Sequence, residues 1–264
     1  MRTSRQNSAF TLFELLVILI VIAFLVCALL PVLARTNQDT NAVQCLNNFR
    51  QLMNGWKMYS DDYQGKLVPN RTDTAPGNWV KGFMDFSSSS DNTNIDNLVG
   101  SNALLGVYVR SASFFKCPAD KSMVRNSSTW MPRVRSISMN AYVGEGSHGW
   151  NTSYRQYEKS VDVVSPTPAN LWILIDEHED SINDGAFYTA PTASSTSDTI
   201  VDFPASRHNR AGTISFADGR AEIHVWRDAR TMPRPTYTGS LSLNVFSPNN
   251  VDMDWLNQRS SSPP

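Results

Sequence analysis

The sequence predicts an α+β protein in which a long N-terminal helix packs on a small, mostly antiparallel β-sheet head with long loops. Two patterns carry this prediction. An uncharged apolar run covers residues 15–34, and amphipathic helical spacing follows it as far as Tyr63. Farther along, short apolar or alternating runs are separated by turn formers, and Asp218-Gly219 is the strongest hairpin signal among them.

The apolar run is long enough to cross a bilayer. About 20 residues at 1.5 Å of rise each span roughly the 30 Å hydrocarbon core. The leader before the run carries Arg2 and Arg5 and no acid, which favours a cytoplasmic amino terminus. A secretory signal peptide would place its small-residue cleavage site after the run, whereas Ser8-Ala9 precede it. We therefore expect a single-pass inner (cytoplasmic) membrane protein with its head in the periplasm or outside the cell.

The second half of the helix is amphipathic and should pack against the head. Apolar residues recur at three- and four-residue steps: Ala42, Leu46, Phe49, Met53, Trp56 and Tyr63. Gly65 and then Pro69 end this pattern, as is typical beyond a helix C-terminus. The whole helix would then be about 80 Å long at the standard rise.

The head contains four strand candidates. Residues 114–117 resemble a short strand before a turn, and residues 137–141 alternate like a half-buried strand. Residues 171–175 resemble a buried strand. The fourth candidate is the hairpin of residues 213–217 and 220–226. The chain after Asp228 is rich in Pro, Ser and Asn, which predicts irregular structure.

Charge and cysteine content narrow the function classes. The 264-residue chain has a formal net charge of −1, so nothing indicates a nucleic-acid partner. Of the three cysteines, Cys27 lies inside the apolar run and should be a packing residue. Cys45 and Cys117 both fall on the expected exported side, where disulfides persist. Cys45 and Cys117 could form a disulfide, or they could be two buried free thiols. Their spacing in the sequence cannot decide between these alternatives.

The segment Ala9-Phe10-Thr11-Leu12-Phe13-Glu14-Leu15 resembles the processing site of type IV pilins and type II secretion pseudopilins. The resemblance implies cleavage after Ala9 by a prepilin peptidase, methylation of the new amino group on Phe10, and a role for Glu14 in pairing with a neighbouring subunit. Ala9 departs from the glycine that is usual in the family. The implied partners are the prepilin peptidase, other pilin or pseudopilin subunits and an inner-membrane assembly platform.

A second resemblance covers most of the chain to about Trp226. His208 and Asp218-Gly219 form a His-x9-Asp-Gly motif. Upstream elements accompany it: Cys45-Leu46-Asn47-Asn48-Phe49-Arg50-Gln51-Leu52, Cys117-Pro118-Ala119-Asp120 and Asp176-Glu177. This ensemble is similar to a family of prepilin-type proteins with a His-x9-Asp-Gly processing-associated domain. It implies an architecture and an export route more than an activity.

Five residues of the head are candidate metal ligands: Asp176, Glu177, Asp184, His208 and Asp218. Carboxylates gathered at strand ends suit a hard cation such as Ca²⁺, which takes oxygen ligands. Each residue also has a structural interpretation. Turns account for Asp184-Gly185 and Asp218-Gly219, and His208 is typical of a hydrogen-bonded residue at a strand edge. No serine lies in a Gly-x-Ser-x-Gly elbow, so the motifs do not indicate a catalytic site.

The sequence thus predicts a pseudopilin or minor pilin-like structural subunit rather than an enzyme, assembled into a type II secretion or type IV pilus-like filament. An adhesin or glycan-binding protein displayed on a pilin stem is the main alternative, since tryptophans such as Trp130 and Trp150 could form a sugar platform. A membrane-anchored hydrolase that uses His208 or Asp176 is a third hypothesis. The expected organisation is a leader (1–9), an apolar helix (10–34), its amphipathic extension (35–65), the head (66–228) and an irregular tail (229–264).

Overall fold

The computed structural model of the chain describes residues 12–71, 77–101, 103–146 and 149–264, with side chains described outside 26–39. The chain divides into two compact units, one ending at Thr40 and the other comprising residues 41–264. Each unit is described by itself. The predicted cleavage residues Ala9 and Phe10 lie outside the described residues.

Helix α1 runs from Leu12 to Asp62 and continues through Pro31. Among the described residues, no helix combines the length and the apolarity needed to cross a membrane. This finding overturns the predicted transmembrane half of the helix and, with it, the single-pass inner-membrane localisation.

The second unit is built on a five-stranded sheet of order β5-β3-β4-β7-β8. Its strands are β3 (Ile137–Asn140), β4 (Trp172–Asp176), β5 (Ala186–Phe187), β7 (Ala211–Phe216) and β8 (Ala221–Val225). All neighbours pair antiparallel except β5, which runs parallel to β3. β4 is buried along its whole length, as its central place in the sheet requires.

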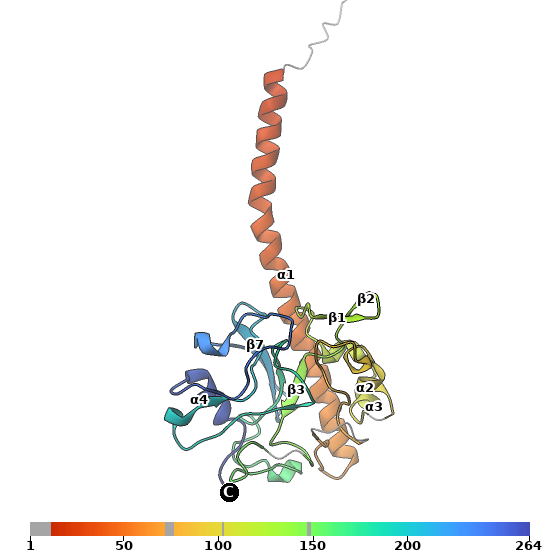
Figure 1. Ribbon diagram of the computed structural model, residues 1–264, viewed down its shortest axis with the longest axis vertical. Helices are drawn as coiled ribbons and strands as arrows, with labels where there is room; N and C mark the ends of the chain where they lie inside the picture. The colour runs from red at the N-terminus through yellow and green to blue at the C-terminus, as the bar shows by residue number, and fades with distance from the viewer. Residues whose placement is uncertain (1–11, 72–76, 102, 147–148) are drawn as a thin grey trace, which may run out of the picture. The chain divides into compact units, whose positions relative to one another are not determined.

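Apolar layers cover both faces of this sheet. On one face, Phe49, Leu52 and Trp56 of α1 pack in one cluster with Met139 and Ile173. A second cluster joins sheet residues to the C-terminal helix α4 (Val251–Asn257) through Trp172, Ile214, Phe216, Met253 and Leu256. Figure 1 shows β3 and β7 between the C-terminal part of α1 and α4. The central strands of the sheet are therefore enclosed on both faces.

Shorter elements connect this framework. The helices are α2 (Asp96–Val99) and α3 (Gly106–Val109), with 3-10 turns at Ser90–Asn92, Ala112–Phe115, Ser160–Asp162, Ser195–Ser197 and Ala229–Thr231. Two small sheets pair β1 (Met123–Asn126) with β2 (Thr129–Pro132) and β6 (Thr199–Ile200) with β9 (Val245–Phe246). These elements lie mostly in long connections.

The strand predictions are partly confirmed. The hairpin around Asp218-Gly219 forms between β7 and β8, and Gly219 has a φ of +93° that favours glycine. Residues 112–115 form a 3-10 turn instead of the expected strand over 114–117. The expected irregular tail contains α4. β3 is buried on both faces rather than half-buried, because a sheet covered on two sides hides alternate residues as well.

Candidate functional site

The first candidate region is the N-terminal part of α1. Glu14 lies in the first helical turn, and every described side chain of residues 12–25 is exposed. The exposed fractions reach 84% for Leu12, 72% for Phe13 and 73% for Phe24. Exposed apolar surface on this scale is typical of a surface that another apolar surface covers.

The second candidate region is the predicted acidic set, which the fold divides. Asp176 and His208 meet in one buried group. Asp218 is exposed in the hairpin, where its Oδ1 accepts from the backbone N–H of Arg220 at 2.9 Å. Asp184 is half-buried and its Oδ1 accepts from the N–H of Ala186 at 2.8 Å. The turn interpretations therefore describe Asp184 and Asp218 well, and no shared cation site is formed by the five residues as a set.

Glu177 is buried but is not part of the group that contains Asp176 and His208. Its carboxylate accepts from the hydroxyls of Ser138 and Ser181, the second at 2.8 Å. Burial raises its pKa, and the nearby charge of Asp202 raises it further. These neighbours account for the carboxylate without a metal ion.

Asp176 and His208 instead meet two cysteines. Four side chains, Cys45, Cys117, Asp176 and His208, place one ligand atom each within 4.8 Å of one another, and all four are buried. We call this group the thiol cluster. The Cys117 Sγ and His208 Nε2 atoms are 3.2 Å apart. Cys45 lies in α1, and Asp176 is the last residue of β4. Cys117 lies in the loop after the 3-10 turn Ala112–Phe115, and His208 lies in the loop before β7.

A second layer of polar groups orients the thiol cluster. Ser136 Oγ donates to Asp176 Oδ1 at 2.8 Å and accepts from the Cys117 N–H at 2.9 Å. Thr213 Oγ1 of β7 donates to Cys45 Sγ at 3.3 Å. Arg207 Nη1 lies 2.6 Å from Asp176 Oδ1, and this ion pair is buried. Cys45 and Asp176 thus each have a partner outside the thiol cluster that orients the side chain, whereas the side chains of Cys117 and His208 contact each other.

Arg207 also joins a second buried carboxylate. Its Nε atom lies 2.8 Å from Glu179 Oε1, and its Nη2 donates to the backbone carbonyl of Glu177 at 2.8 Å. Burial lowers the pKa of Arg207, but the charges of Asp176 and Glu179 outweigh it and raise the pKa well above its ordinary value. Arg207 therefore stays charged beside the thiol cluster.

The protonation tendencies of the thiol cluster follow from its burial. The side-chain hydrogen bond with Cys45 and then burial raise the pKa of the Cys117 thiol. Burial raises the pKa of Asp176, although Arg207 and Ser136 oppose that shift. Burial lowers the pKa of His208, but its hydrogen bond with Cys117 and the neighbouring charges raise it overall. With no ion bound, the neutral form of the Cys117 thiol is favoured.

Cys45 and Cys117 are free thiols in this structure, so the possible disulfide is not formed. Each sulfur instead contacts a polar neighbour, Thr213 or His208 respectively. Sequence reasoning placed both cysteines and His208 in separate motifs and did not join them. No short spacing links the four residues, so local ligand patterns could not have found the group.

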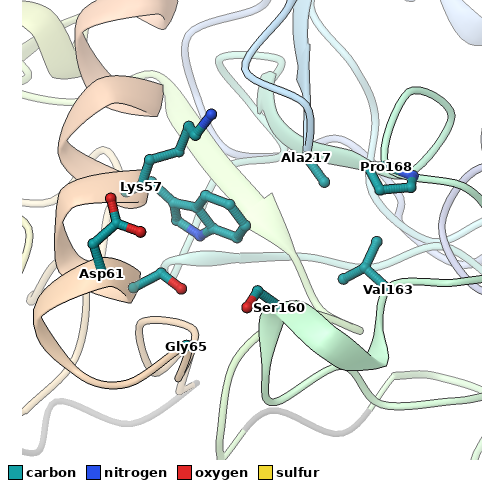
Figure 2. A pocket seen from close by; sticks show the side chains of 9 residues that line it. Lys57, Asp61, Gly65, Ser160, Val163, Pro168 and Ala217 are labelled. Carbon is teal, nitrogen blue, oxygen red and sulfur yellow. The ribbon is translucent and has the colours of Figure 1, made fainter.

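One open cavity of about 220 Å³ lies where α1 ends. Figure 2 shows Lys57 and Asp61 of α1 on one side and Ser160, Val163 and Pro168 on the other. Trp56 also lines it, and the buried Nε1 of this indole has no hydrogen-bond partner. Sites for drug-sized ligands measure about 300–1,000 Å³, so this cavity is small for an oligosaccharide.

The tryptophans do not gather into one platform. Trp79 and Trp226 are buried in the core, whereas Trp130 and Trp150 are exposed on separate segments. Trp150 packs edge-on against Tyr188, with ring centroids 6.4 Å apart. His224 of β8 is half-buried and stacks on Trp255 with a centroid separation of 3.8 Å. The glycan-binding alternative stays a prediction without an assigned site.

Comparison of the chain with protein-family models, curated proteins and solved structures gives no match. The resemblance to prepilin-type proteins therefore rests on the sequence motifs alone.

Proposed function

We propose that the protein is a pilin-type structural subunit, whose N-terminal helix packs against the equivalent helices of other subunits in a filament. The observation that carries this proposal is the exposure of every described side chain of residues 12–25. Burying one Leu, Ile or Phe side chain contributes about 1.5–3 kcal/mol, so covering even half of this surface is worth on the order of 10 kcal/mol. The free helix has a strong drive to associate.

The apolar side chains surround the helix instead of forming one stripe. Residues 15–25 contain no polar side chain, and those on opposite sides, such as Ile18 and Ile20, are 42% and 60% exposed. A helix that is apolar on all sides is typical of one enclosed by other apolar elements. Several neighbouring helices of the same kind would provide that enclosure, which is the arrangement of a filament core.

Glu14 gives this packing a register. It is the only carboxylate between Ser8 and Ala34. Cleavage after Ala9 by a prepilin peptidase would create an amino group on Phe10, four residues before Glu14 in the sequence. A charge among apolar side chains is costly, and an opposite charge on a neighbouring helix offsets much of that cost. Pairing of Glu14 with the Phe10 amine of the next subunit would therefore fix the axial offset.

The test begins with processing. The full chain is expressed with a prepilin peptidase or with a catalytically inactive form of it, and the mature amino terminus is identified by mass spectrometry. We expect N-methylated Phe10 only with the active peptidase. An uncut chain, or a chain cut after the apolar run, would contradict the proposal.

Assembly is then measured on the processed chain by cross-linking through single cysteines placed in residues 15–25. Glu14→Gln should be cleaved normally but lose most subunit-to-subunit cross-links, because the glutamine cannot form the ion pair. Glu145→Gln, a change in the head, is the matched control and should cross-link like the parent chain. Equal cross-linking of the two variants would refute the role of Glu14.

A further inference from the structure

We propose that the thiol cluster is a metal site that binds one Zn²⁺ ion through Cys45, Cys117, Asp176 and His208. Two sulfurs, one imidazole nitrogen and one carboxylate oxygen make up a donor set that zinc prefers. Calcium takes only oxygen ligands, so this group does not suit it. The inference is independent of the proposed filament role.

The spacing of the ligand atoms fits a tetrahedral ion after a small contraction. Zinc bonds of about 2.2 Å place the corners of a tetrahedron about 3.6 Å apart. The four ligand atoms lie within 4.8 Å of one another, and one pair, Cys117 Sγ and His208 Nε2, is already at 3.2 Å.

A second observation points to a missing ligand. Asp176 is fully buried, and its Oδ1 atom is used by Ser136 and Arg207. Its Oδ2 atom is also buried but has no hydrogen-bond partner. An unpaired carboxylate oxygen in the interior is costly, and native structures rarely keep one. A cation bound by the thiol cluster would give this oxygen its partner.

The charges balance when the ion is present. Zinc binds thiolates, so Cys45 and Cys117 would each release a proton and contribute one negative charge. Asp176 contributes a third negative charge. The ion supplies two positive charges and Arg207, paired with Asp176, supplies one. The ion, its four ligands and Arg207 are therefore neutral together, and this count leaves out Glu179, the second carboxylate that pairs with Arg207.

The surroundings resemble the outer layer of a metal site. The hydroxyls of Ser136 and Thr213 donate to Asp176 and Cys45, as groups that orient metal ligands commonly do. All four ligands are buried, so no coordination position opens to solvent, and zinc sites closed in this way are structural. The ion would fasten α1, the end of β4 and two loops to each other.

The test uses the full chain, purified in detergent under reducing conditions. The protein is incubated with ZnCl₂, freed from unbound ion by gel filtration, and analysed for metal by mass spectrometry. A parallel sample receives Co²⁺, whose spectrum reports sulfur ligation and tetrahedral geometry. We expect about one ion per chain and a thiolate-to-cobalt charge-transfer band.

Variants locate the site. Cys117→Ser and Asp176→Asn should weaken binding by at least about tenfold, as loss of ligands or their supports typically does. Asp218→Asn is the matched control, an aspartate outside the thiol cluster, and should bind like the parent chain. Circular dichroism checks that each variant is folded.

Three results would overturn the proposal. One is a folded parent chain that binds neither Zn²⁺ nor Co²⁺. Another is a Co²⁺ spectrum without the sulfur band. The third is a Cys45–Cys117 disulfide in the protein as isolated, detected by mass spectrometry of unreduced peptides. The first two readouts come from the parent chain, so they remain decisive even if a ligand variant fails to fold.

Discussion

Arg207 offers the sharpest test of how the head is held together. Its side chain is 6% exposed and pairs with Asp176 at 2.6 Å and Glu179 at 2.8 Å, whose side chains are 0% and 3% exposed. Replacing it with glutamine (Arg207→Gln) keeps a polar side chain but removes the charge. Both carboxylates would then stay buried without a cation beside them.

The expected loss of stability is large for a single substitution. Removing one partner of a buried ion pair costs about 3–5 kcal/mol, because the remaining charge is desolvated and unpaired. Arg220 provides a matched control, since its pair with Glu222 is exposed by 43% and 34%. Breaking an exposed pair costs about 0–1 kcal/mol. The two substitutions remove the same group, but Arg207 pairs with two buried carboxylates and Arg220 with a single, more exposed one.

Urea unfolding of the full chain in detergent with a chelator present, followed by tryptophan fluorescence, measures both losses. Arg207→Gln should lower the free energy of unfolding several-fold more than Arg220→Gln. Equal losses would refute the reasoning from burial.

The pH dependence gives a second readout for Arg207→Gln. Burial raises the pKa of Asp176 and Arg207 opposes that shift, so removing Arg207 raises the pKa further. A carboxyl whose pKa is raised by folding stabilises at low pH and loses that contribution as the pH rises through the folded value. The variant should therefore lose less stability at about pH 5 than at about pH 8. A loss that is larger at the lower pH would contradict the role of Asp176.

Two further predictions concern other buried carboxylates. Burial, opposed by the Tyr188 N–H, raises the pKa of Asp202 from 3.8 to about 7, so its stabilising contribution is complete at low pH and disappears as the pH rises toward 7. Above about pH 8, Asp202→Asn should therefore unfold at a higher urea concentration than the parent chain, with a free energy of unfolding larger by up to about 4 kcal/mol. At about pH 4 the two proteins should unfold alike, and a stability difference that does not change with pH would contradict this. The Asp180 carboxylate accepts from the backbone N–H groups of residues 236–239. Asp180→Ala should therefore lower the free energy of unfolding by about 1–3 kcal/mol and speed proteolysis in that loop. Unchanged cleavage there would show that other contacts hold the loop.

Local sequence patterns determined several elements of the head. The apolar run at residues 171–175 corresponds to β4 (Trp172–Asp176), and the Asp-Gly pair forms the turn between β7 and β8. Both signals depend on a few adjacent residues, which is why they could be read without the fold. The amphipathic spacing after Ala42 likewise predicted which side chains of α1, such as Phe49 and Trp56, pack in the core.

Other local signals were misjudged. Asn250 caps α4 by accepting from the N–H groups of Asp252 and Met253, a pattern visible in the sequence but hidden among Pro, Ser and Asn residues. The apolar run at the amino end was interpreted as a membrane span, which the helices of the described residues do not support. A hydropathy pattern shows that a segment is apolar, but it does not show whether lipid or protein covers that segment.

The sequence by itself grouped Asp176 with His208 as candidate metal ligands and Cys45 with Cys117 as a possible disulfide, but it did not join the two pairs. Only the tertiary structure brings their ligand atoms within 4.8 Å and buries them between α1 and the sheet. The physical reason is that the four residues come from segments far apart in the chain, joined through the packing of α1 on β3 and β4 and not through any local spacing. Tertiary contacts, unlike turns and strands, leave no short pattern in the sequence.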